Sequence, residues 1–218
     1  ARDRQTGVGQ IIATTPLTGP LYLLGKWLSN FAVLMAMVTV LALAGLVLQF
    51  WKGESAQIDL LAFLAPFLFI VLPLMALVAA FAVLFEAIPF LQGGFGNIVY
   101  FIAFISFLPL TVESLTSKYA VFEPTGIGLL AQNMRTAVRA VYPDYSGTFS
   151  LGPAKKVVST FTWTGVDWTP DLILARFTLI GLAILLTLLA ALFFDRFDPS
   201  RAKPRRTKNA LLQPDTST

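Results

Sequence analysis

Few residues of this chain carry charge or chemical reactivity, and two of them interrupt long apolar stretches. Glu86 lies near the end of one apolar run, and Arg176 lies about two turns inside another. An ionisable group within a membrane-spanning helix commonly faces a pathway or pairs with a neighbouring helix. The alternatives are a boundary carboxylate for Glu86 and, for Arg176, a side chain that reaches the membrane interface past Trp168. Glu86 and Arg176 are therefore candidate pathway residues.

The composition excludes several kinds of catalytic and metal site. The sequence contains no cysteine and no histidine, which removes disulfides, thiol nucleophiles, Ser-His pairs and Cys/His metal sites. The glycine-rich turn at residues 93–96 lacks the Lys-Ser/Thr pair of a phosphate-binding loop. We therefore predict no catalytic residue, no metal site and no cofactor. An enzyme that uses Glu86 or Arg176 alone is kept as an alternative.

The composition is typical of a membrane protein. Of 218 residues, 56% are hydrophobic and 13% are charged, whereas a soluble domain has about 25% charged residues. Long uninterrupted apolar runs predict an all-α polytopic membrane protein with about four transmembrane helices, and they disfavour a soluble helical protein with a large core. We expect these spans at residues 27–51, 58–88, 98–115 and 170–194.

Tryptophans and prolines characterise the first two predicted spans. Trp27 and Trp51 stand at the two ends of the first span, which is the usual place of an interfacial tryptophan. Pro66 and Pro73 lie within the second span. Because neighbouring helices can satisfy the carbonyls that a proline frees, we expect this span to be kinked or broken into two halves.

The region at residues 116–168 differs in character from the spans. It contains most of the charged residues between the spans, together with many glycines and prolines. Residues 129–141 have the apolar spacing of an amphipathic helix, and residues 145–168 alternate in a way that favours a short strand pair or a surface loop. Trp163 and Trp168 are interpreted as interface anchors rather than ligand contacts.

The basic residues predict the orientation in the membrane. They gather in residues 1–26 and in the tail at residues 195–218, whereas the short loop at residues 52–57 holds only Lys52. By the positive-inside rule, both ends are cytoplasmic and residues 116–168 are extracytoplasmic. The net charge of +4 therefore reflects topology in a cell (inner) membrane and indicates no nucleic-acid partner.

The first 26 residues carry an ordered motif. Its parts are, in chain order, Asp3-Arg4, Thr6-Gly7, Ile11-Ile12, Thr15-Pro16-Leu17 and Leu24-Gly25-Lys26. This order resembles the cytoplasmic segment before the third span of type-2, exporter-like ABC transporter permeases. The chain also ends its last span with Phe194, Asp195 and Arg196 in a way that is similar to such permeases. The sharp matches cover only the two ends of the chain.

The resemblance implies an ATP-driven transporter. Such permeases have about six spans, so this chain would be a C-terminal fragment that lacks the first two. The resemblance also implies a separate ABC-type ATPase subunit, a second permease copy or homologous half, and an amphipathic coupling helix that docks on the ATPase. By position, the ATPase-coupling residues are Arg4, Thr6, Val8, Gln10, Ile11, Ile12 and Pro16. The alternative for this segment is an interfacial helix lying on lipid.

The predicted organisation follows from the spans and the resemblance. It comprises a cytoplasmic coupling segment (1–26), three transmembrane helices (27–115), an extracytoplasmic region (116–168), a last transmembrane helix (169–194) and a basic cytoplasmic tail (195–218). The extracytoplasmic region is longer than the short hairpin of the simplest members of the family. The expected function is export of a substrate, with lipid, drug, peptide and ion all suited to the architecture. A non-transport scaffold or assembly protein is the alternative.

Overall fold

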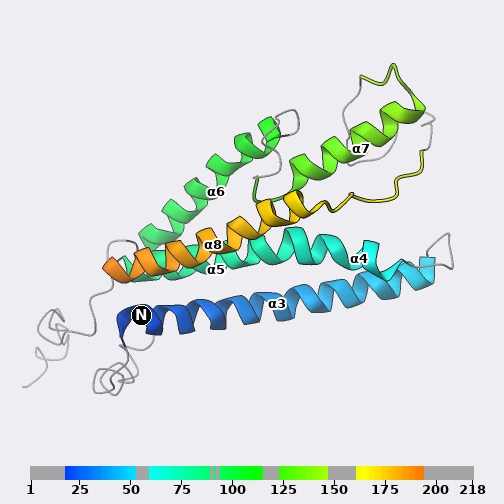
Figure 1. Cartoon of the computed structure of the whole chain (residues 1–218). Coiled ribbons are helices and arrows are strands. Elements are labelled where there is room, and N and C mark those ends of the chain that lie inside the picture. Colours follow the sequence, from blue (N-terminus) through cyan, green and yellow to red (C-terminus); the bar gives the residue numbers. More distant parts are fainter. Residues whose placement is uncertain are drawn as a thin grey trace, which may run out of the picture. The chain divides into compact units, whose positions relative to one another are not determined.

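The chain is described by a computed structural model in which all regular elements of the described residues are helices (Figure 1). The described residues belong to one compact unit, Thr18–Phe194. They are residues 18–52, 59–88, 91, 94–114, 123–146 and 161–193. The predicted coupling residues and the basic tail lie outside these ranges.

The first predicted span is longer than expected. Helix α3 covers Gly19–Lys52, which is 34 residues, so it begins eight positions before the predicted start at Trp27. Gly19 and Pro20 occupy its first turn, where a proline loses no hydrogen bond because the first N–H groups have no helical partner. The Leu24-Gly25-Lys26 junction is therefore helical.

The second predicted span is a continuous helical segment with a change of hydrogen-bond register inside it. It consists of α4 (Leu60–Pro66), the π-helical η1 (Phe67–Val71) and α5 (Leu72–Ala87). Asp59 caps its start, because Oδ1 accepts hydrogen bonds from the Leu61 and Ala62 N–H groups at 3.0 Å. Pro66 directly precedes η1 and Pro73 lies in the first turn of α5, so the disturbance expected from the two prolines takes the form of a π-helical segment within a continuous helix.

The third predicted span coincides with α6, Gly94–Ser114, which starts within the predicted glycine turn. Glycine is required at position 96, because a Cβ there would lie 1.8 Å from the carbonyl oxygen of Leu91. The ring of Tyr100 on α6 meets that of Phe85 on α5 edge to face, with centroids 5.6 Å apart.

Helix α7, Ile127–Val141, confirms the predicted amphipathic helix. Leu129 and Val138 are its buried large apolar side chains, whereas Val141 at its end is exposed. Residues 161–169 are irregular and contain no strand. The rest of the region predicted as a strand pair lies largely outside the described residues.

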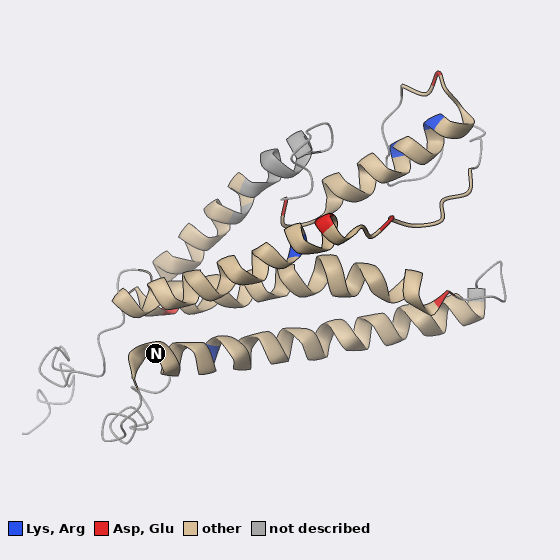
Figure 2. Ribbon diagram, in the orientation of Figure 1, with Lys and Arg blue, Asp and Glu red and all other residues tan. Residues whose placement is uncertain are grey.

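Three helices are long and apolar enough to cross a membrane: Gly19–Trp51, Leu60–Ala87 and Pro170–Phe193. The last is α8, Pro170–Phe193. The third predicted span, on α6, contributes only the shorter apolar stretch Gly94–Ala103 within the described residues. Figure 2 shows that α3, α5 and α8 are almost wholly free of charged residues.

Small side chains form the contact between α5 and α8, which pack on each other and on α3. Ala76 and Ala80 on α5 and Ala183 and Ala190 on α8 are completely buried. Small residues allow helix backbones to approach closely, which is how helices associate where lipid supplies no hydrophobic drive. By contrast, α3 exposes many large apolar side chains, as expected of a lipid-facing helix.

Candidate functional site

Arg176 on α8 is enclosed by the protein, with a side chain that is 0% exposed. Its guanidinium donates to three backbone carbonyls. Nε binds the oxygen of Phe69 at 3.2 Å, Nη1 that of Glu123 at 2.6 Å, and Nη2 that of Pro124 at 3.2 Å. The structure therefore disagrees with the alternative of an arginine that reaches the membrane interface.

The carbonyl of Phe69 is available because of the proline that follows it. In an α-helix this carbonyl would accept from the N–H group four residues later, and that residue is Pro73, which has no N–H. Phe69 also lies in η1, where the backbone departs from α-helical register. Arg176 thus donates a hydrogen bond to a carbonyl whose usual α-helical donor is missing because residue 73 is proline.

The other two carbonyls belong to a tight turn at residues 123–126 that leads into α7. Oε1 of Glu123 accepts from the Thr125 N–H at 2.8 Å, and the Gly126 N–H donates back to the Glu123 carbonyl at 3.3 Å. Gly126 has φ +71°, and a Cβ there would lie 2.5 Å from Cγ2 of Ile70. Only glycine satisfies both the left-handed backbone and the close approach to η1.

This turn enters the helical bundle instead of passing over its end. Arg176 stands about 9 Å along α8 from its first residue, at about 1.5 Å per residue, and the turn reaches it there. Buried irregular backbone needs hydrogen-bond partners for its polar groups. The arginine provides those donors for Glu123 and Pro124.

Aromatic side chains surround the same place. Phe69 contacts Trp168 with ring centroids 4.9 Å apart, and Phe177 with centroids 6.2 Å apart. Nε1 of Trp163 donates to Oδ1 of Asn133 on α7 at 2.7 Å. Both tryptophans predicted as interface anchors thus make contacts within the chain, which places the irregular residues 161–169 beside α7 and η1.

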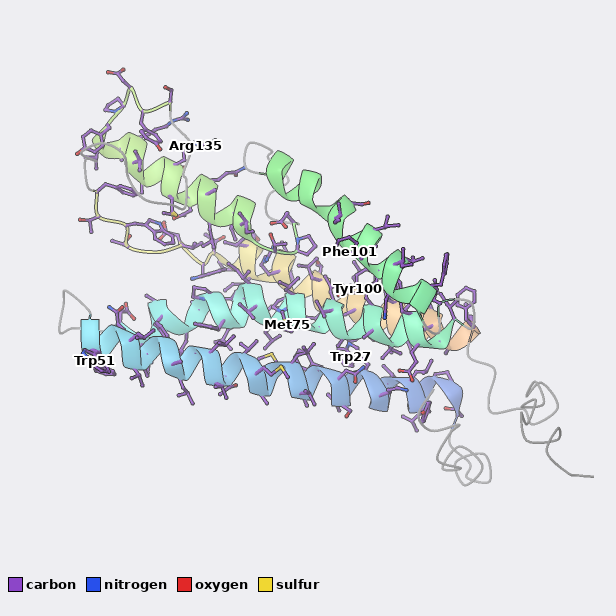
Figure 3. All side chains as sticks on the ribbon, turned by 180° about the vertical axis from the view of Figure 1, so that it is seen from behind. Trp27, Trp51, Met75, Tyr100, Phe101 and Arg135 are labelled. Carbon is purple, nitrogen blue, oxygen red and sulfur yellow. The ribbon has the colours of Figure 1, made fainter. Side chains whose placement is uncertain are left out.

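A second polar contact joins α3 to α5. Nζ of Lys26 forms an ion pair with Oε1 of Glu86 at 2.5 Å. One position further along α3, Nε1 of Trp27 donates to the carbonyl of Ala76 at 3.0 Å, and its ring stacks on Phe31 at 5.7 Å. Figure 3 shows Trp27 on the side of α3 that faces α5. Trp27 therefore contributes to helix packing, whereas Trp51 at the other end of α3 is largely exposed.

The two candidate pathway residues are not brought together. Arg176 contacts Phe69, and Glu86 stands on the same continuous helix about 25 Å further along its axis, at about 1.5 Å per residue. Glu86 has the partner that one interpretation predicted, and the partner is Lys26. A single site that uses both charges directly is incompatible with this separation.

The seven predicted ATPase-coupling residues lie at positions 4–16, outside the described residues. The sequence reasoning missed the carbonyl acceptors of Arg176 and the role of Gly126. One signal for the first was present, because a proline four residues after Phe69 marks a carbonyl without its helical donor. Pro124 and Gly126 did mark a turn at residues 123–126, but nothing in the sequence marked its contact with Arg176.

Comparisons with known proteins identify no relative. No family model matches the chain, and no curated protein and no solved structure matches it significantly.

Proposed function

We propose that this chain is the membrane-spanning permease subunit of an ATP-driven, ABC-type exporter that works with a separate ATPase subunit. The observation that carries the proposal is the ordered motif of residues 1–26, which leads directly into a long apolar helix. In this proposal α6 is a fourth span, both chain ends are cytoplasmic, and a second permease copy completes the pathway.

The geometry of α3 supports a coupling role for the segment before it. Because α3 begins at Gly19, no flexible loop separates the Leu24-Gly25-Lys26 part of the motif from the span. A docked segment that moves with an ATPase would therefore displace α3 as a rigid body. The side-chain contacts of Lys26 and Trp27 would pass that displacement to α5.

The arrangement of charges also favours transport over intramembrane catalysis. Arg176 is held by backbone carbonyls and Glu86 is paired with Lys26, at separate places along the bundle. The two charged groups therefore do not combine into one joint site within the described residues. The alternative, a non-transport scaffold protein, differs from this proposal because it would have neither an ATPase partner nor ATP-dependent flux of a substrate.

The test is co-purification of the full chain with an ABC-type ATPase subunit, beginning with any that is encoded beside it. We expect Ile11→Asp and Ile12→Asp to abolish the association, since a charge on the apolar side of a docking helix is unfavourable at an interface. Leu211→Asp, the same type of change in the tail, is the matched control and should retain the ATPase. Binding that survives both isoleucine changes would overturn the docking role.

A further inference from the structure

Arg176 connects three segments that are far apart in the sequence. Its own helix α8 meets η1 through Phe69 and meets residues 123–126 through two carbonyls. We call residues 123–146, which comprise this turn and α7, the α7 segment. The arginine thus fastens the turn at the start of the α7 segment to α8 and η1.

The acceptors of Arg176 belong to backbone that can rearrange without unfolding a helix. Five residues of η1 are π-helical, and π-helical turns are commonly found at functional positions of longer helices. The turn at residues 123–126 is irregular and joins η1 closely at Gly126. A small change in the register of η1 would therefore move the Phe69 carbonyl and the neighbouring turn together.

A single side chain holds three separate segments at this contact. The three acceptors are backbone carbonyls, and the charge of Glu123 adds a favourable electrostatic interaction with the guanidinium. A guanidinium has five N–H donors in a fixed plane and can engage carbonyls of separate segments at once. An ammonium group at the same position lacks that fork.

We propose that Arg176 is a latch: it holds the α7 segment against α8 and η1 in the state seen here and releases it during the transport cycle. This inference rests on the proposed transport function for the cycle, whereas the holding role does not depend on it. Arg176 is then a positioning residue and does not itself bind the substrate.

Single cysteines can test the latch because the natural chain has none. Leu129→Cys reports on the α7 segment, since Leu129 is only 9% exposed, and Ala80→Cys reports on the α5–α8 contact, since Ala80 is 0% exposed. Tyr142→Cys, where the native side chain is 39% exposed, is the accessible control. Alkylation of each by a maleimide is measured in the full chain with Arg176, Arg176→Lys or Arg176→Met.

We expect Arg176→Met to raise the alkylation rate at Leu129→Cys by about tenfold or more, the effect of losing one hydrogen bond to a charged group. Arg176→Lys should give a smaller increase, and it keeps the test usable if the Met variant does not fold. The rates at Ala80→Cys and Tyr142→Cys should not change. An unchanged rate at Leu129→Cys, or an equal rise at Ala80→Cys, would overturn the latch.

The release step is tested in the complex with the ATPase. Addition of ATP should raise the alkylation rate of Leu129→Cys with native Arg176, and it should raise it little in the already released Arg176→Met background. A rate that ATP leaves unchanged overturns the release. If no ATPase binds at all, the proposed function and the release fail, but the result on the isolated chain still decides the holding role.

Discussion

Nε of Arg176 donates to the carbonyl of Phe69 across 107 positions of sequence, at 3.2 Å. The acceptor stands four residues before Pro73, where an α-helix would lack a donor. A carbonyl that lacks its α-helical donor in one helix thus accepts a hydrogen bond from a buried arginine of another helix. Because each group would be unfavourable inside a membrane without the other, the two are structurally interdependent.

Replacement of Pro73 should weaken this contact. In Pro73→Ala the new N–H can donate to the Phe69 carbonyl, which favours an α-helical register and competes with Arg176. We expect faster alkylation of Leu129→Cys, by less than in Arg176→Met. Pro66→Ala is the matched control, since the carbonyl that it affects belongs to Ala62, which is not an acceptor of Arg176. Equal effects of the two prolines would contradict this account.

A side chain at Gly126 should destabilise the protein. Gly126→Ala places a Cβ at φ +71° and 2.5 Å from Cγ2 of Ile70. The left-handed backbone alone costs about 1–2 kcal/mol, and the contact adds to it. Thermal unfolding in detergent should show a lower midpoint. Gly181→Ala, in α8 with open space around its Cβ, should have little effect or be stabilising.

The same site offers a rescue experiment. Ile70→Ala removes the methyl group that a Cβ on residue 126 would meet. We therefore expect the double variant Ile70→Ala with Gly126→Ala to be less destabilised than the sum of the single variants. Strict additivity would show that the contact with Ile70 does not contribute to the effect of Gly126→Ala.

Exchanging the charges of Lys26 and Glu86 should restore the stability that each single charge reversal loses. Lys26→Glu and Glu86→Lys each bring like charges together, and the double variant re-forms the pair. The two side chains are 24% and 35% exposed, so solvent screening limits the coupling to about 0.2–1 kcal/mol. A double-mutant cycle of unfolding in detergent measures it, and higher salt should reduce it. A cycle with no coupling would refute a stabilising role for the pair.

Enlargement of the small residues between α5 and α8 should separate these helices. Ala183→Leu adds volume at a position with no exposed surface, and overpacking of this kind costs about 1–3 kcal/mol. Ala44→Leu, on the exposed surface of α3, is the control and should be neutral. Midpoints of thermal unfolding compare the two. Similar stability of both variants would argue against close α5–α8 packing.

Part of this protein follows from the sequence alone. The long apolar runs predict the helices that the structure shows as α3, the segment Leu60–Ala87 and α8. The reason is that a hydrocarbon layer accepts only a backbone that satisfies its own polar groups. The apolar spacing of α7 and the disturbance between Pro66 and Pro73 were also predictable, since both arise from local geometry. The exact start of α3 was not, because glycine and proline are compatible both with a break and with a first helical turn.

The partners of the charged residues were decided only by the tertiary structure. The sequence marks Arg176 and Glu86 as groups that need partners, but an arginine can satisfy its donors with lipid headgroups, carboxylates or carbonyls alike. Which of these it meets depends on how α8 is rotated and where residues 123–126 enter the bundle. Close packing of small side chains between α5 and α8 fixes that rotation, and such packing joins residues about a hundred positions apart in the chain.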